Sequence, residues 1–326
     1  RGPIIVKKAI IAAFALVVVA GRLVAGETES DATSPFAFDR IVVDADFPSG
    51  YQVETADVDG DGKLDIVGLG GDVCAWYQNP TWKKRVVTDK RDTPGIISSA
   101  TADLDGDGKA EIAIAYDFEM NQPRHGKLLL AKQGAKLDDP WVIEPSPSIP
   151  SIHRLRWGDL DGSGRLKLLV APIFGPAAKP PTYDDPAHIV SVVPGGTFLG
   201  PLQGFVIAPL ADRLVTHAVE ILPSFGPIER PVVLVASNQG VTLIEPGDAK
   251  ARTKRKARDL VPGAAGERPK RGASEIHGGK FEDGRLFLAT IEPWHGTDVG
   301  VWPQKSADSL EFGPRTVLDD TLADGH

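Results

Sequence analysis

Residues 57–65 read Asp57-Val58-Asp59-Gly60-Asp61-Gly62-Lys63-Leu64-Asp65, and the same pattern returns as Asp103-Leu104-Asp105-Gly106-Asp107-Gly108-Lys109-Ala110-Glu111. Both copies place acids at the first, third, fifth and ninth positions and a glycine at the sixth. Carboxylate oxygens at this spacing can surround a hard cation, and the glycine permits the sharp turn. We therefore expect calcium in both loops.

The flanking residues distinguish these loops from a helix–loop–helix calcium site. Such a site needs a glutamate at the twelfth position, which here holds Gly68 or Ile114. The residues after each loop are rich in β-branched side chains, which favours strand–loop–strand hairpins. The alternative is an acid-rich turn without an ion. The candidate calcium ligands are Asp57, Asp59, Asp61 and Asp65 in the first loop and Asp103, Asp105, Asp107 and Glu111 in the second.

A third copy of the pattern at residues 159–167 carries Lys167 in place of the ninth acid. The glycines that form the turn are kept. We expect a hairpin there, with metal weakly bound or absent.

Composition limits the class of protein. The chain has 326 residues, of which 42% are hydrophobic, so it can bury a large core. Its 35 Gly and 27 Pro suit many short strands joined by turns. The net charge of -8 argues against nucleic acid as a partner, because phosphate binding needs a basic surface. A single cysteine, Cys74, excludes an intrachain disulfide.

The first residues resemble an export signal. Lys7 and Lys8 precede an apolar run over residues 9–20, and small residues follow as far as Gly26. We predict a signal peptide over residues 1–25, cleaved near Ala25, and a linker over 26–35. The protein would then be secreted or periplasmic, with no stable membrane span after cleavage, because the run is too short. The alternative is a buried N-terminal helix.

The acid loops also fix the positions of the strands around them. Alternating and β-branched runs predict units of four strands that recur about every fifty residues. Such repeats indicate an all-β β-propeller with four-stranded blades. The predicted strands are 51–56, 64–69, 73–78, 84–88; 96–102, 111–116, 127–131, 141–144; 152–158, 166–172, 188–193, 205–208; 215–222, 232–236, 241–245, a segment near 259; and 275–281, 286–291, 299–302, 315–318.

The two ends of this region suggest a larger ring. Residues 38–44 resemble the fourth strands, and residues 322–326 resemble the approach to another first strand. We expect residues 36–326 to form about five blades of a propeller that would hold about six to eight. The propeller would be truncated at its C-terminus.

The histidines are predicted to share one rim. Because strands alternate in direction, the starts of first strands lie opposite the acid loops. His153, His217 and His277 fall at those starts and are expected to converge near the central channel. They could hold zinc or another divalent ion, or serve in packing and hydrogen bonding. His295 follows Glu292 closely in a segment whose composition suits a ligand pocket.

The acid loops and residues 76–80, Trp-Tyr-Gln-Asn-Pro, resemble the FG-GAP or VCBS repeats of secreted β-propellers. Residues 153–157, 216–217, 274–277, 293–296 and 325–326 resemble the propeller of the aldos-2-ulose dehydratase family. That resemblance implies a divalent-metal site associated with dehydration and isomerisation of oxidised sugars. The cupin domains that follow in that family are missing from this sequence.

Two hypotheses follow. The first is a calcium-stiffened, ligand-binding module for a glycan, sugar or protein partner, and we rank it slightly ahead. The second is a metal-dependent lyase or isomerase acting on keto-sugars. In it His153, His217 and His277 hold the cation that polarises the sugar carbonyl, and His295 or Glu292 moves the proton.

Overall fold

The computed structural model describes residues 4–7, 39–194, 205–247, 255–323 and 325. The chain divides into two compact units, Arg1–Gly50 and Tyr51–His326. In the first unit, β1 (Ile4–Lys7) pairs antiparallel with β2 (Arg40–Asp44). Within the described ranges, no helix has the length and apolar character needed to cross a membrane.

The N-terminal predictions fall largely outside the described residues. Strand β1 lies within the predicted signal peptide, but residues 8–25 and the predicted linker over 26–35 do not belong to the described part. Signal cleavage and export therefore stay predictions. The expected fourth-strand role of residues 38–44 is not what the structure shows, because β2 pairs with β1 in a two-stranded sheet.

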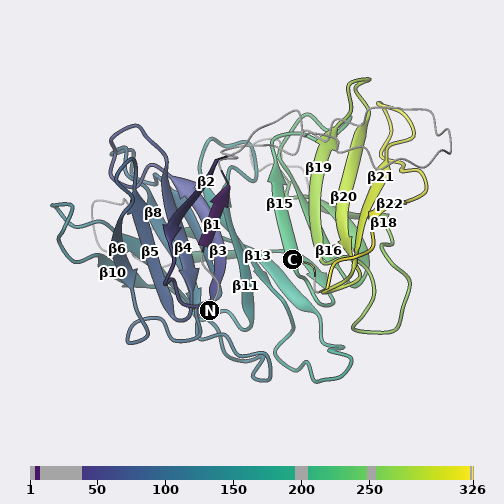
Figure 1. Ribbon diagram of the computed structural model, residues 1–326. Helices are drawn as coiled ribbons and strands as arrows, with labels where there is room; N and C mark the ends of the chain where they lie inside the picture. The colour runs from purple at the N-terminus through teal and green to yellow at the C-terminus, as the bar shows by residue number, and fades with distance from the viewer. Residues whose placement is uncertain (1–3, 8–38, 195–204, 248–254, 324, 326) are drawn as a thin grey trace, which may run out of the picture. The chain divides into compact units, whose positions relative to one another are not determined.

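The described part of the second unit consists of five four-stranded antiparallel sheets, which are propeller blades (Figure 1). Each sheet is a meander in which consecutive strands pair. Blade 1 is β3 (Gly50–Ala56), β4 (Asp65–Gly70), β5 (Val73–Gln78) and β6 (Lys83–Thr88); blade 2 is β7 (Ser98–Ala102), β8 (Glu111–Tyr116), β9 (Lys127–Lys132) and β10 (Val142–Pro145). Blade 3 is β11 (Ile152–Gly158), β12 (Lys167–Pro172), β13 (Ala187–Pro194) and β14 (Phe205–Arg213). Blade 4 is β15 (Ala218–Leu222), β16 (Val232–Ser237), β17 (Gly240–Glu245) and β18 (Lys256–Val261); blade 5 is β19 (Glu275–Lys280), β20 (Leu286–Glu292), β21 (Asp298–Pro303) and β22 (Thr316–Asp319).

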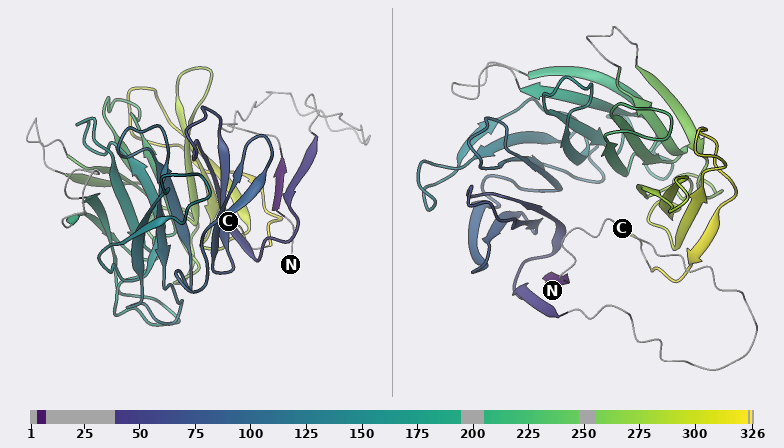
Figure 2. Two further views of the ribbon diagram at one scale, coloured as in Figure 1. Left: turned by 90° about the vertical axis from the view of Figure 1, so that its left-hand side faces the viewer. Right: turned by 90° about the horizontal axis from the view of Figure 1, so that it is seen from above.

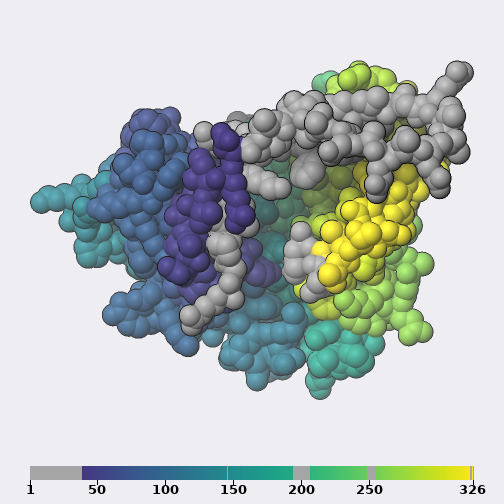
Figure 3. All heavy atoms as spheres, in the orientation of Figure 1, coloured from purple at the N-terminus to yellow at the C-terminus, as the bar shows by residue number. Residues whose placement is uncertain are grey.

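Burial follows the position of a strand within its blade. All residues of β4 and β16 are buried, as expected for strands covered on both faces. All four residues of β22 are exposed, and this outer strand lies in the yellow C-terminal region at the surface in Figure 3. Second strands therefore form the core of each blade, and fourth strands form its edge.

The hydrophobic core lies between neighbouring blades, which stand side by side in chain order (Figure 2). One cluster of buried side chains joins blades 1 and 2, another joins 2 and 3, a third joins 3 and 4, and a fourth joins 4 and 5. Leu155 on β11 is fully buried in the cluster between blades 2 and 3. Packing of this kind brings the first strands together, and β11 contacts both β7 and β15.

The five predicted four-strand units are confirmed, with strand ends that differ by a few residues. The main difference is β14, which was expected to end at residue 208 and reaches Arg213. Its extension pairs with the start of β13, beyond a register shift between Ile189 and Val190. A bulge of this kind is set by cross-strand pairing and leaves little trace in one strand's sequence. The larger ring stays a prediction.

Core packing between blades can be tested at Leu155. Leu155→Ala is expected to lower the free energy of unfolding by about 2–5 kcal/mol, because it leaves a cavity in a fully buried cluster. The control is Val206→Ala on β14, where the side chain is 65% exposed. That change should cost less than about 0.5 kcal/mol. Urea unfolding measures both, and equal costs would contradict packing between blades through Leu155.

Candidate functional site

A backbone turn with a positive φ angle precedes two histidines that lie at the start of first strands. Ser151 and Val215 have φ angles of 56° and 50°, and each stands two residues before a histidine, His153 or His217. A β-branched residue such as Val215 rarely adopts this conformation, which costs about 1–3 kcal/mol. The fold holds the same strained turn in blades 3 and 4, and both imidazoles emerge at the first strands.

His217 is fully buried and held by its Nδ1 atom. That nitrogen lies 3.1 Å from the Ser274 carbonyl oxygen, 3.1 Å from Glu275 Oε1 and 3.2 Å from Ser274 Oγ. Since a carbonyl oxygen only accepts, Nδ1 carries the proton and donates. In the neutral ring, Nε2 then holds the lone pair. This is not a hydrolase triad, because serine and carboxylate face the same nitrogen.

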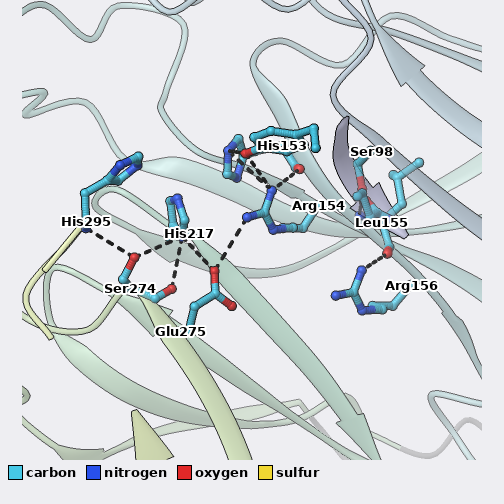
Figure 4. A network of polar contacts seen from close by, with 11 residues as sticks. Ser98, His153, Arg154, Leu155, Arg156, His217, Ser274, Glu275 and His295 are labelled. Carbon is cyan, nitrogen blue, oxygen red and sulfur yellow. Dashed lines mark hydrogen bonds and ion pairs between the residues drawn. The ribbon is translucent and has the colours of Figure 1, made fainter. Parts of the chain in front are cut away.

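Arg154 connects three blades, and Figure 4 shows the network around it. Its Nη1 donates to the Tyr51 hydroxyl of blade 1 at 3.1 Å, and its Nη2 lies 3.5 Å from Glu275 Oε1 of blade 5. The guanidinium also packs over the Tyr51 ring at 5.5 Å. The Tyr51 hydroxyl lies 3.1 Å from His153 Nε2 in turn. Side chains of blades 1, 3 and 5 therefore meet at one guanidinium.

Three imidazoles lie in series beside this network. The His153 and His217 ring centroids are 4.8 Å apart, and those of His217 and His295 are 4.9 Å apart. His295 has a φ of 49°, and its backbone N–H donates to Ser274 Oγ at 3.2 Å. Gly296 follows, where a Cβ would lie 2.1 Å from the Glu292 carbonyl carbon. We call Tyr51, His153, Arg154, His217, Glu275 and His295 the inner cluster.

An apolar group of aromatic residues supports the inner cluster. Phe174 stacks on Tyr183 at 4.2 Å, and Trp294 meets both edge-on. Trp294 also contacts the His295 ring at 5.1 Å. Phe174 and Trp294 are buried, so they position the loop that carries His295.

Charges of both signs continue along the first strands. Glu54 on β3 accepts hydrogen bonds from the Ser99 hydroxyl and, at 3.2 Å each, from the backbone and hydroxyl of Thr101. Burial raises the pKa of Glu54, although these bonds oppose the shift. Burial also lowers the pKa of Arg156, and the charge of Arg154 adds to that effect. Together with Glu275, these residues carry both negative and positive charges, and neither sign of charge dominates.

Glu292 does not lie where a proton-transfer group is needed. Its carboxylate is fully buried inside blade 5 and accepts from Thr290 Oγ1 at 2.6 Å and Trp302 Nε1 at 2.8 Å. Arg315 Nη1 donates to its other oxygen at 2.7 Å. The predicted catalytic role of Glu292 is therefore replaced by an internal ion pair that joins β20 to the region before β22. His295 does reach the inner cluster, beside His217.

His277 is separate from the other predicted zinc ligands. Its Nδ1 lies 2.7 Å from Glu220 Oε1, and Glu220 Oε2 accepts the Gly278 N–H at 2.7 Å. Among the described residues, His277 does not gather with His153 and His217 into a group of three potential ligand atoms within 4.8 Å. The structure places His295 beside His217 instead.

The inner cluster does not fit a zinc ion. Arg154 Nη1 lies 3.5 Å from His153 Nε2, and a guanidinium at that distance repels a divalent cation. The Tyr51 hydroxyl contacts the same nitrogen. The two expected ligands that do meet, His153 and His217, therefore lie beside the positive charge of Arg154.

The first acid loop does gather carboxylates. Ligand atoms of Asp57, Asp59 and Asp61 lie within 4.8 Å of one another. Asp65 is not in that group: it is fully buried and accepts the Val58 N–H at 3.0 Å and the Asn79 N–H at 2.8 Å. Burial raises the pKa of Asp65. Three of the four predicted ligands therefore converge, and the fourth holds the turn.

The second and third loops differ from the first. In the second, Asp103, Asp105 and Glu111 converge, without Asp107, and Lys132 Nζ contacts Asp105 directly. In the third, Lys167 Nζ contacts Asp161. The hairpin expected there is present between β11 and β12.

Sequence reasoning missed Tyr51, Arg154 and Glu275 as members of the site. Arg154 and Glu275 lie in two of the segments that carry the family resemblance, residues 153–157 and 274–277, yet those segments carry no sign of a bond between blades. Only the spatial meeting of the first strands reveals their partners. Tyr51 had a weaker signal, as an aromatic residue at the start of a first strand.

Comparison with known proteins identifies the repeat. Residues 57–114 match the model of an FG-GAP-like repeat. The FG-GAP-like segment runs from the first acid loop to the middle of β8 and so includes both complete acid patterns. No curated protein matches the chain significantly.

Two solved structures resemble the chain at 10% identity. A protein of unknown function from Dyadobacter fermentans matches 83% of this chain and 83% of its own, with a TM-score of 0.47. The GH43 BlXynB protein from Bacillus licheniformis matches 86% of this chain and 56% of its own, with a TM-score of 0.40. Neither likeness carries an argument about function.

The His277–Glu220 pair predicts a pH dependence. The hydrogen bond to Glu220 raises the pKa of His277, and burial opposes part of the shift. The stabilisation is full below the unfolded pKa of about 6.5 and is lost as pH rises through the folded value. Glu220→Gln should therefore destabilise the protein more at about pH 5.5 than at about pH 8.5. NMR titration should show a lower His277 pKa in the variant; equal values would contradict the pairing.

Proposed function

We propose that this propeller is a secreted ligand-binding module that binds a glycan at the inner cluster. The observation that carries the proposal is Arg154, held between Tyr51, His153 and Glu275 from three different blades. A guanidinium fixed in this way presents planar donors in a defined direction and loses little side-chain entropy on binding. Export rests on the signal peptide expected at residues 1–25.

The mixed chemistry of the cluster favours a sugar over an anion or a cation. Each sugar hydroxyl both donates and accepts, so a guanidinium beside a carboxylate can bind two neighbouring hydroxyls at once. Arg154 and Glu275 offer such a pair, with Arg154 Nη2 3.5 Å from Glu275 Oε1. Tyr51 is 43% exposed and offers ring surface beside them. A net charge of -8 leaves nucleic acid disfavoured.

Calcium has a supporting role in this proposal. Asp57, Asp59 and Asp61 would hold the ion in the first acid loop, as their convergence supports. Bound calcium would neutralise these carboxylates and stiffen the hairpin between β3 and β4. It would lie at the opposite end of the first strands from the inner cluster and take no part in binding the sugar.

The enzyme hypothesis has less support. A lyase or isomerase similar to the aldos-2-ulose dehydratase family would need a divalent ion among His153, His217 and His277. His277 pairs with Glu220 instead, and Arg154 occupies the vicinity of His153. Glu292, one of its two proton-transfer candidates, is sealed in an ion pair with Arg315.

Binding can be tested with immobilised neutral oligosaccharides of glucose, xylose and mannose, with polygalacturonate for comparison. We expect a neutral oligosaccharide to bind, and Arg154→Ala to weaken binding by about 10–100-fold, as for loss of hydrogen bonds to a charged group worth about 1.5–3 kcal/mol. Calorimetry on the retained sugar measures the change. Arg154→Lys should recover only part of the affinity, because it lacks the planar fork.

The matched control is Arg285→Ala. Arg285 pairs with Asp283 in the turn between β19 and β20, away from the inner cluster, and its loss should leave affinity unchanged. Circular dichroism confirms that each variant is folded. Equal affinities for wild type and Arg154→Ala would contradict the proposal, and so would binding of a protein partner with no sugar retained.

A further inference from the structure

We propose that, in the two loops that have a ninth acid, the residue opposite that acid decides whether the loop binds calcium, and that Lys132 supplies the cation of the second loop itself. The inference deepens the proposed calcium site of the first loop and rests on it for the comparison. It departs from the sequence prediction of calcium in both loops. The deciding residues lie on the third strands of the blades, outside the acid pattern in the sequence.

Strand register defines the position that matters. Ile66 pairs with Tyr77, and Ile112 pairs with Ala131. Continued by one residue, these two registers set Gln78 opposite Asp65 and Lys132 opposite Glu111. Both residues end their strands. The two loops therefore have the same backbone pairing. At this position the first loop has a neutral amide and the second has an ammonium group.

In the first loop, Gln78 reaches the carboxylates without adding charge. Its Nε2 donates to Asp59 Oδ2 at 2.6 Å, and its Oε1 accepts from Arg85 Nη1 at 2.8 Å. Lys63 pairs with Asp61 at 2.6 Å, but its side chain is 52% exposed and on the solvent side. The amide of Gln78 carries no charge, so it does not repel a cation as an ammonium group would.

In the second loop, Lys132 reaches three acids at once. Its Nζ contacts Asp105 directly and lies 3.5 Å from Glu111 Oε1 and 3.9 Å from Asp107 Oδ2. Asp105 and Glu111 are two of the three converging carboxylates of this loop. An ammonium among these oxygens occupies the place of an ion and would repel one.

Lys132 is a cation at neutral pH, as an ordinary lysine is, and its Nζ lies 3.5 Å from Glu111 Oε1. Glu111 is only 2% exposed, so its charge needs a compensating cation from one source or another.

In the third loop, a lysine at another position makes an equivalent contact with an acid. Lys167 replaces the ninth acid itself, and its Nζ contacts Asp161. Two lysines from different strands therefore serve the same purpose in neighbouring blades. This repetition supports substitution of a metal by a side chain over an incidental surface ion pair.

A reciprocal exchange tests the inference on the full chain. The variants are Lys132→Gln, which gives the second loop the residue of the first, and Gln78→Lys, which does the reverse. Equilibrium dialysis against calcium gives the number of ions bound. Calorimetric melting in EDTA and in excess calcium gives the stabilisation by the ion.

The matched control is Lys127→Gln. Lys127 lies at the other end of β9 and pairs with Asp117 at 3.1 Å, so the variant makes the same change of net charge away from the loop. Wild type and Lys127→Gln should each bind one calcium ion. Lys132→Gln should bind one more and show a larger calcium-dependent rise in melting temperature. Gln78→Lys should bind one fewer.

Two results would overturn the inference: two ions bound by the wild type, or no additional ion in Lys132→Gln that is folded by circular dichroism. If Lys132→Gln folds poorly, calcium binding undiminished in Gln78→Lys would overturn it independently. A wild type with no ion and a Lys132→Gln variant with one would contradict calcium in the first loop while supporting the role of Lys132. The two proposals therefore fail separately.

Discussion

The packing of the second unit depends on sheets whose two faces are both apolar and must both be covered. Residues of β4 and β16 are buried throughout, so a single meander cannot satisfy its own hydrophobic surface. Each neighbouring pair of the five blades shares one buried cluster, which provides that cover. Because the cover comes from the next blade, the first strands of all blades are forced close together.

This crowding creates the inner cluster. First strands carry polar residues such as Glu54, Arg154 and Glu275, which lose water when the blades pack and must find partners on other strands. Arg154 finds Tyr51 and Glu275, and His217 finds Glu275 and Ser274. A ligand that exchanges hydrogen bonds with this network meets groups already oriented, so the rigidity that the core requires also serves recognition.

Local patterns in the sequence predicted most of the fold and only part of the site. Alternation and turn residues act over a few positions, which is why the four-strand units and acid hairpins could be assigned. The extension of β14, the Glu220 partner of His277 and the Arg315 partner of Glu292 depend on pairing across strands. Such pairs join residues with no shared local signal, so the histidines were placed correctly near first strands but grouped wrongly.

At two places where the sequence predicted a metal ion, the structure has a positively charged side chain. Zinc was expected among histidines where Arg154 lies, and calcium among carboxylates where Lys132 lies. A side-chain cation is covalently attached, so it is present at any ion concentration and imposes no binding equilibrium on folding. It also has a fixed direction of approach, unlike a free ion. Lys132 and Lys167 contact acids of the second and third loops, so part of the negative charge there is compensated by the chain itself.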